Sequence, residues 1–253
     1  GLVTVQARRA LHPLLRSTLV CARLHTSAEM CSVLNGHLGD DFGTRMVVAA
    51  ERFVLRHADR VVAPGREVLD TYSRFYGPAA PRRSAVAAQP RPVPAPLAPA
   101  ALIAPVVPPD PDGPAEPPPL DGGLRFLYVG RLERRKGVQD LVRAFTDLAR
   151  DDWHLTLVGG DTDTGPLATS LRRVLELTVG GDHRIEFVDA TSRAGVRAAV
   201  DSHHVLVAPS RWECWPSTVL EALARNRPVL VTPTGGMPEM VAAATGAGWV
   251  ADG

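Results

Sequence analysis

Short apolar runs alternate with amphipathic stretches through the second half of the chain. Between the first two runs, apolar side chains fall on one helical face at Val138, Leu141, Val142, Phe145, Leu148 and Ala149. Between the next two runs, the same holds for Leu167, Leu171, Val174, Leu175 and Thr178. The runs themselves predict strands at 124–129, 154–158, 184–188, 204–208, 229–232 and 248–250. Apolar strands that alternate with helices predict an α/β fold with a doubly wound parallel sheet.

The first part of the chain carries a weaker pattern of the same kind. Strands are expected at 2–6, 18–24, 59–63 and 84–88, with a long helix over Thr44 to His57. Residues 1–89 are therefore predicted to form part of a second Rossmann-like α/β domain. The sequence opens on a predicted strand without Met, so we expect that the amino-terminal part of this domain is missing.

A proline-rich tract separates the two patterns. Residues 90–119 hold 13 prolines, a density from which we expect no helix or sheet but extended polyproline II. The segment Pro96 to Pro99 matches a PxxP ligand, but such matches are frequent in any proline-rich tract. We therefore predict a linker at 90–121 between a domain at 1–89 and a domain at 122–253.

Charge and cysteine content narrow the protein class. Residues 1–89 hold 12 Lys/Arg against 7 Asp/Glu, and residues 120–253 hold 15 against 17. A basic region of this kind is most often a solvated face, and the alternatives are an anionic acceptor or peripheral contact with a membrane. No nucleic-acid partner follows from it. Three cysteines without CxxC spacing argue against a zinc site or a disulfide framework, so a reducing, cytoplasmic location is expected.

Unusual residues cluster after the predicted strands. Arg131 and Lys136 follow the first strand of the second domain, Ser210 to Ser217 follow the fourth, and Thr234 to Gly236 follow the fifth. In an open parallel sheet, ligands bind outside the carboxyl ends of the strands. The sequence therefore predicts a ligand site at this edge of the sheet.

Lys136 is the one lysine among 28 Lys/Arg residues. A position that stays lysine in so arginine-biased a chain is consistent with the need for a compact charge on a flexible stem, as in phosphate binding. Chance survival of one lysine is the plainer alternative.

Two glutamates stand with seven residues between them. A helix that begins near Ser217 or Thr218 would place Glu221 on its first turn and Glu213 on the preceding loop, so that both could face one cleft. Free N–H groups at that helix start would suit a phosphate. The alternative is a capping box formed by Thr218 and Glu221, and spacing alone leaves the two interpretations even.

Three segments together resemble the donor domain of retaining GT-B glycosyltransferases of family 4. They are Tyr128 to Gly137, Ser210 to Leu223 and Thr234 to Glu239, in the family's order and spacing. Leu24-His25-Thr26 and the segment from Glu51 to Pro64 resemble the second half of that family's acceptor domain. The resemblance implies an enzyme with two Rossmann-like domains that transfers a sugar from a nucleotide sugar.

The resemblance also implies roles for single residues. Arg131 and Lys136 match the basic pair that binds the donor diphosphate and stabilises the leaving group without a metal or other cofactor. Glu213 matches the glutamate that addresses the donor sugar, and Glu221 matches the one that accepts hydrogen bonds from the ribose. The site is completed by the backbone at Gly130, Thr218 and Val219, which would meet the donor, and by His25, which would reach a sugar hydroxyl. For His25, a satisfied structural histidine is an equal alternative. The acceptor, whether glycan, lipid or small molecule, is not specified.

The sequence departs from the family pattern in two places near the site. Cys214-Trp215-Pro216 stands where glycines commonly follow the first glutamate, so a bulkier sugar pocket is expected. Asn226 replaces a frequent glycine, a change that the left-handed cap conformation tolerates. The family's amino-terminal glycine-rich loop is absent from this sequence, so we expect donor binding with poor turnover.

Other functions remain as alternatives. A dinucleotide-dependent oxidoreductase would need GxGxxG after its first strand, and the near match at Gly246 precedes a strand instead. Asp161-Thr-Asp163 resembles a metal-binding DxD, but a helix-capping turn before Pro166 is the favoured interpretation. A truncated nucleotide-sugar-binding remnant and a nucleotide-sugar epimerase of the same architecture stay open beside the transferase.

Overall fold

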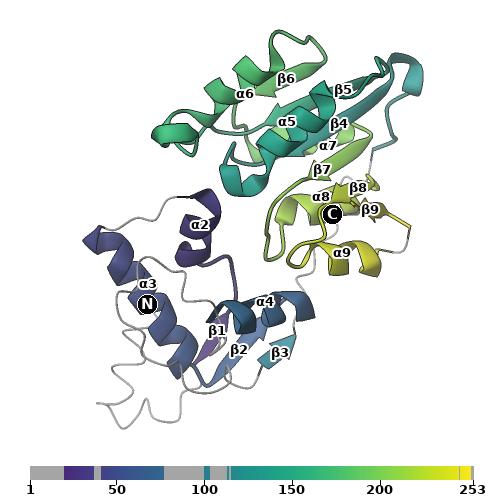
Figure 1. The fold of residues 1–253 in the computed structure, drawn as a ribbon. Helices are drawn as coiled ribbons and strands as arrows, with labels where there is room; N and C mark the ends of the chain where they lie inside the picture. The colour runs from purple at the N-terminus through teal and green to yellow at the C-terminus, as the bar shows by residue number, and fades with distance from the viewer. Residues whose placement is uncertain are drawn as a thin grey trace. The chain divides into compact units, whose positions relative to one another are not determined.

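The computed structural model describes residues 20–36, 41–76, 100–102, 113, 115–244 and 246–251. The chain divides into two compact units, residues 1–105 and residues 106–253. Each unit carries a parallel sheet, drawn in Figure 1. The strands expected at 2–6 and 84–88 lie outside the described residues.

The second unit is built on a six-stranded sheet in the order β6-β5-β4-β7-β8-β9, and each pair of neighbouring strands is parallel. The chain runs outward from β4 to one edge and then returns through β7 to the other edge, which is the doubly wound topology. The strands are β4 (Leu124–Val129), β5 (Trp153–Val158), β6 (Ile185–Val188), β7 (Val205–Ala208), β8 (Val229–Val231) and β9 (Gly248–Val250). All six predicted strands are confirmed within one residue at each end.

Helices cover both faces of this sheet. Side chains alternate along each strand, so Tyr128 faces a cluster with α5 (Val138–Thr146) and α6 (Leu171–Val179), while Leu127 faces the opposite cluster. The opposite cluster is filled from α7 (Arg193–Asp201), α8 (Ser217–Ala224) and α9 (Met237–Ala243). Burial on both faces explains why the strands are apolar runs without alternation.

The first unit contains a smaller parallel sheet in the order β1-β2-β3. Its strands are β1 (Cys21–Arg23), β2 (Arg60–Ala63) and β3 (Ala100–Leu102), and its helices are α2 (Ala28–Asn35), α3 (Phe42–His57) and α4 (Arg66–Tyr76). The predicted helix at 44–57 is confirmed and starts two residues earlier, because Asp41 caps it by accepting from the Thr44 N–H at 2.9 Å.

The proline-rich tract contains more regular structure than its composition predicted. Its Ala100–Leu102 segment is strand β3, which pairs with β2, because those positions fall in a proline-free stretch. At the end of the tract, the Arg227 Nη2 donates to the carbonyls of Ala115 and Glu116 at 3.0 and 2.9 Å. The expectation of a tract free of sheet was therefore wrong, and residues 115–116 belong structurally to the second unit.

Local backbone conformation confirms one prediction and corrects another. Asn226 follows the end of α8 with a φ of 54°, the left-handed conformation that asparagine tolerates. Leu167 was expected on the helical face of α6, but it lies in the short 3₁₀ helix Pro166–Ala168 and is 99% exposed. The helix begins only at Leu171, because Ser170 caps it by accepting from the Arg173 N–H.

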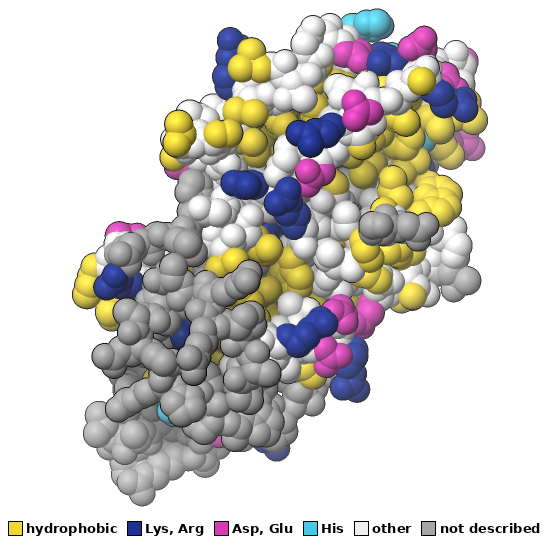
Figure 2. Space-filling model, viewed as in Figure 1, with side chains coloured by type: hydrophobic (Ala, Val, Ile, Leu, Met, Phe, Trp, Pro, Cys, Tyr) yellow, Lys and Arg dark blue, Asp and Glu magenta, His cyan; other side chains and the backbone are white. Residues whose placement is uncertain are grey.

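The described surface mixes charges of both signs. On the face shown in Figure 2, Lys and Arg side chains are interspersed with Asp, Glu and apolar side chains. None of the helices in the described ranges is both long and apolar enough to cross a bilayer. Peripheral membrane contact through the basic first region stays a prediction.

Candidate functional site

The loops that follow β4 and β7 lie against each other at the carboxyl edge of the sheet. The β4 loop ends in the 3₁₀ turn Arg134–Lys136 and then in Gly137, whose φ is 67°. A Cβ on Gly137 would lie 2.0 Å from the Pro209 carbonyl oxygen, so only glycine allows this approach. The Arg211 N–H also donates to the Arg135 carbonyl at 2.9 Å. The basic motif and the Glu213 loop are thus fixed to each other by backbone contacts.

The loop after β8 supports Glu213 from the other side. The hydroxyls of Thr232 and Thr234 donate to the Ser210 carbonyl, at 2.5 and 3.0 Å. The Gly236 N–H donates to the Glu213 carbonyl at 3.0 Å, and Gly235 has a φ of 60°. A Cβ on Gly235 would lie 1.8 Å from that same carbonyl oxygen. The loops after β4 and β8 therefore both hold the loop that carries Glu213.

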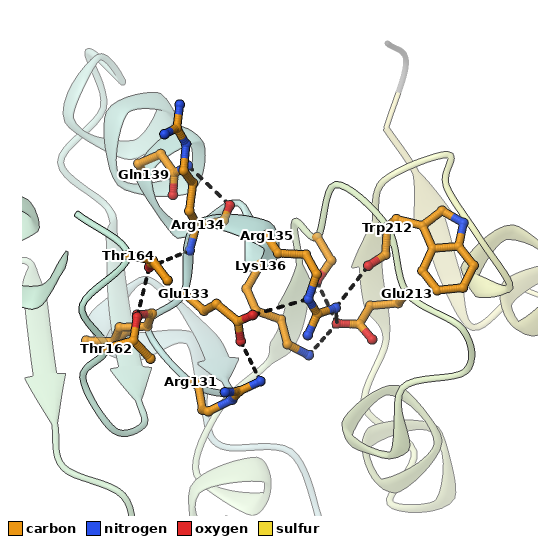
Figure 3. A network of polar contacts seen from close by, with 12 residues as sticks. Arg131, Glu133, Arg134, Arg135, Lys136, Gln139, Thr162, Thr164, Trp212 and Glu213 are labelled. Carbon is orange, nitrogen blue, oxygen red and sulfur yellow. Dashed lines mark hydrogen bonds and ion pairs between the residues drawn. The ribbon is translucent and has the colours of Figure 1, made fainter. Parts of the chain in front are cut away.

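The side chains at this edge form one chain of alternating charges, shown in Figure 3. Arg131 pairs with Glu133 at 2.7 Å, and Glu133 contacts Arg135 at 3.3 Å. Arg135 donates to Glu213 at 2.9 Å, and Lys136 forms an ion pair with the same Glu213 oxygen. The two cations assigned to the diphosphate, Arg131 and Lys136, are thus the two ends of one network whose middle is buried.

The described hydrogen-bond and ion-pair partners of Glu213 contact only one of its two carboxylate oxygens. Arg135, Lys136 and the Ser210 hydroxyl all address Oε1, the last at 3.4 Å. No donor from the described part of the chain reaches Oε2. The side chain is 9% exposed, so this oxygen is held at a nearly buried position by the bonds to its neighbour. It can accept a hydrogen bond from a hydroxyl that enters the site.

Tyr128 fixes the backbone at the other end of the network. Its hydroxyl donates to the Arg131 carbonyl at 2.6 Å. Burial raises the pKa of Tyr128, and the negative charges of Glu213 and Glu133 add to the effect. The phenol therefore stays protonated and keeps the carbonyl of Arg131 in place, while the guanidinium of Arg131 is 64% exposed and reachable by a ligand.

Helix α8 begins at Ser217 with Pro216 at its N-cap position, and no side chain caps it. The capping-box alternative for Thr218 and Glu221 is therefore wrong, since Thr218 is already inside the helix. Glu221 lies on the second turn rather than on the first. The N–H groups of the first turn, including those of Thr218 and Val219, have no acceptor within the helix. Val219 itself is buried in the core, so its backbone alone is offered to a ligand.

Glu221 makes no ion pair or hydrogen bond with another described residue. Burial raises the pKa of its carboxyl, while the positive charges of Arg193 and Arg197 on α7 oppose that effect. A half-buried carboxylate without a partner is open to hydroxyl donors, which is what a ribose would supply.

Two further predicted residues, Gly130 and His25, belong to different units of the chain. Gly130 follows β4, and its carbonyl is so close to Gly159 that a Cβ there would approach it to 1.8 Å. His25 lies in the first unit, two residues after β1, with an exposed side chain and with its carbonyl bonded by the Tyr72 hydroxyl. The structure thus fixes the backbone of His25, and the role of its side chain stays a prediction.

Asp161 of the DxD-like turn has a structural role. Its Oδ1 accepts from the Arg172 N–H in the first turn of α6 at 2.8 Å and from the Thr162 N–H at 2.8 Å. Burial would raise the pKa of Asp161, but hydrogen bonds from Ser170, Arg172 and Thr162 outweigh it and lower the pKa. The capping interpretation was right in kind, but the capped helix is α6 and not the turn at Pro166.

Sequence reasoning missed Glu133 and Arg135, which are 1% and 4% exposed. Both stand in a run of charged residues that is typical of a solvated face. The 3₁₀ turn rotates Arg135 inward, where it contacts Glu213, and this rotation is not encoded in the charge pattern. The available signal was the single glutamate inside a basic run at the ligand edge of the sheet.

Comparison with known proteins gives a consistent result. The family described as Glycosyl transferases group 1 matches residues 123–253. The D-inositol 3-phosphate glycosyltransferase of Corynebacterium efficiens is 32% identical over 120 residues, which are 46% of this chain and 28% of that protein. The glycogen synthase of Mycobacterium tuberculosis is 28% identical over 202 residues, which are 78% of this chain and 43% of that protein.

The fold is also that of solved glycosyltransferases. Anabaena Alr3699/HepE in complex with UDP and glucose superposes with a TM-score of 0.62 at 17% identity, over 99% of this chain and 61% of that one. This likeness shows the fold, which is GT-B. The chain spans less than half the length of the curated relatives named above.

Proposed function

Since the chain belongs to the glycosyl transferases of group 1, we propose that it binds a nucleoside diphosphate sugar at the carboxyl edge of its six-stranded sheet. It transfers the sugar to an acceptor with retention of configuration and without a metal ion. The relatives named above are glycosyltransferases and synthases by name, and the solved neighbour holds UDP and glucose. These likenesses support the proposal at the level of the reaction class.

The observation that carries the proposal is the charge network. Arg131 and Lys136 present two cations at the ends of a preformed chain, and their partners Glu133 and Glu213 hold them at the same sheet edge. Cations that already contact the diphosphate in the bound complex stabilise the charge that develops on it as the glycosidic bond breaks. The N–H groups at the start of α8 add positive potential to the same anion.

The carboxylates complete the assignment. Oε2 of Glu213, which no described donor addresses, accepts from a hydroxyl of the donor sugar. Glu221, half-buried and without a hydrogen bond from a described residue, accepts from the ribose. Each carboxylate thus accepts a hydrogen bond from a hydroxyl of the nucleotide sugar that would otherwise be buried without an acceptor.

Calorimetry with UDP, GDP and ADP in EDTA tests the binding half of this proposal. We expect at least one of the three to bind without added metal, and Arg131→Gln to weaken that binding about tenfold, since it removes one charge-assisted contact. Arg150→Gln is the matched control, because Arg150 pairs with Asp152 at an exposed position before β5. Binding that appears only after Mg²⁺ or Mn²⁺ is added would overturn the metal-free assignment.

Product analysis tests the reaction half. A transferase releases nucleoside diphosphate only when an acceptor is present. Inversion of the free nucleotide sugar would identify an epimerase instead, and binding without any product would identify a binding remnant.

A further inference from the structure

Arg135 is the buried centre of the charge network. Its side chain is 5% exposed, and its guanidinium contacts Glu133 at 3.3 Å, the Trp212 carbonyl at 3.2 Å and Glu213 at 2.9 Å. These contacts come from two different strand ends. A side chain so enclosed cannot touch a nucleotide sugar, so any effect on the reaction must pass through its neighbours.

The neighbours through which Arg135 can act are Glu213 and Lys136. Arg135 and Lys136 both bond Oε1 of Glu213, and their side chains are 5% and 21% exposed. An ion pair between a nearly buried carboxylate and its sole cation is costly to break, because the carboxylate is left uncompensated. With Arg135 on the same oxygen, Glu213 keeps a charged partner when Lys136 leaves it.

We infer that Arg135 is a positioning residue that keeps Glu213 charge-compensated and oriented, so that Lys136 can turn from Glu213 to the donor diphosphate. The inference rests on the proposed function and deepens it, since it makes Arg135 responsible for the availability of Lys136. Arg135 also fixes which oxygen of Glu213 remains for the sugar, because it bonds Oε1 and the Trp212 carbonyl of the same loop together.

The test compares nucleoside diphosphate affinity in a double-mutant cycle on the full 253-residue chain. Arg135→Met removes the second cation, so Lys136 becomes the sole charged partner of Glu213 among the described residues. We expect the nucleotide that binds the unmodified chain (UDP, GDP or ADP) to bind this variant about tenfold more weakly. In the Glu213→Gln background, no carboxylate retains the lysine, and Arg135→Met should change affinity less than about threefold. Arg135→Lys keeps a charge at the position and should restore part of the affinity.

A matched control separates positioning from folding. Arg225 is also buried, at 6% exposed, and pairs with Asp201 at 2.5 Å near the ends of α8 and α7. Arg225→Met should lower thermal stability as Arg135→Met does, but leave nucleoside diphosphate affinity unchanged.

A spectroscopic measurement reports on the lysine directly. Because the chain has one lysine, ¹⁵N-lysine labelling gives a single side-chain ammonium signal, which should shift when nucleoside diphosphate is added to the unmodified chain. In Arg135→Met, the same ligand concentration should shift it less. Equal titration curves for the two chains, or an undiminished Arg135→Met effect in the Glu213→Gln background, would overturn the inference. No shift with any of the three nucleotides in the unmodified chain would overturn the proposed function instead.

Discussion

Glu221 is the residue at which stability and binding are expected to separate. Its folded pKa is raised by burial above the usual value of 4.5, so the fold disfavours its charged form. The stability linked to this group is complete below that usual value and is lost as the pH rises through the folded pKa. Glu221→Gln should therefore raise the melting temperature near pH 7, and this gain should vanish below about pH 4.5.

The affinity for nucleoside diphosphate should fall in Glu221→Gln, although its melting temperature rises. An amide makes weaker hydrogen bonds to ribose hydroxyls than a carboxylate, by roughly 1 to 3 kcal/mol. Calorimetry and thermal melts across pH 4 to 8 would measure both quantities. A variant that binds nucleoside diphosphate normally would remove Glu221 from the ribose.

At the residue scale, the sequence predicted the ends of the charge network but not its centre. Arg131 and Lys136, the two ends, and Glu213 beside Lys136 were predicted as site residues because their spacing resembles a known motif. Arg135 and Glu133 were not predicted as site residues, because a charged residue within a charged run gives no sign that it is buried. Their inward direction depends on a 3₁₀ turn that ends at Gly137 and on its approach to Pro209.

At the element scale, Gly235 is expected to be essential to the geometry of the Glu213 loop. Gly235→Ala would place a Cβ 1.8 Å from the Glu213 carbonyl oxygen at a φ of 60°. It should lower the free energy of unfolding by more than the roughly 1 kcal/mol of left-handed strain alone, and also weaken nucleotide binding by displacing Glu213.

Gly180 provides the matched control. It has a similar φ of 63°, and a Cβ there would meet nothing within 4 Å. Gly180→Ala should therefore show the backbone strain alone, with unchanged nucleotide affinity. Equal unfolding free energies and equal affinities for the two variants, measured by denaturant titration and calorimetry, would contradict the role given to the Gly235 contact.

Strands and the main helices were predictable because burial on both faces of the sheet leaves uninterrupted apolar runs. The residue at which α6 begins was not predictable from this pattern. Leu167 fits the apolar face of the helix in sequence, yet Ser170 caps the helix after it, and the preceding residues form a separate turn. The start of α8 at Ser217 was predicted correctly, but spacing alone could not reject the capping box of Thr218 and Glu221, which Pro216 at the cap position excludes.

At the scale of the whole molecule, the second unit is expected to fold and bind alone. Both apolar clusters and the whole charge network lie within residues 106–253. A fragment of these residues should bind nucleoside diphosphate with the affinity of the full chain. A fragment of residues 122–253 should be less stable, by about 1 to 3 kcal/mol for each buried donor left unsatisfied.

The donors in question are on Arg227 and His204. They bond the carbonyls of Ala115, Glu116 and Pro118, which the shorter fragment lacks. Proline density predicted a separation near these residues but could not show where the tract joins the second unit, because that junction is made by side chains more than 80 residues away in sequence. Identical denaturation curves for the two fragments would show that the junction contributes nothing.

The central claim is that Lys136 binds the donor diphosphate, and amine labelling tests it most directly. Apart from the terminal amino group, Lys136 carries the only primary amine of the chain, so an amine-directed reagent followed by peptide mass spectrometry reports on one side chain. We predict that a saturating nucleoside diphosphate protects Lys136 from modification, and that Lys136→Arg, which replaces a compact ammonium by a broad planar group, lowers transfer clearly. Equal labelling of Lys136 with and without saturating nucleotide would contradict the account.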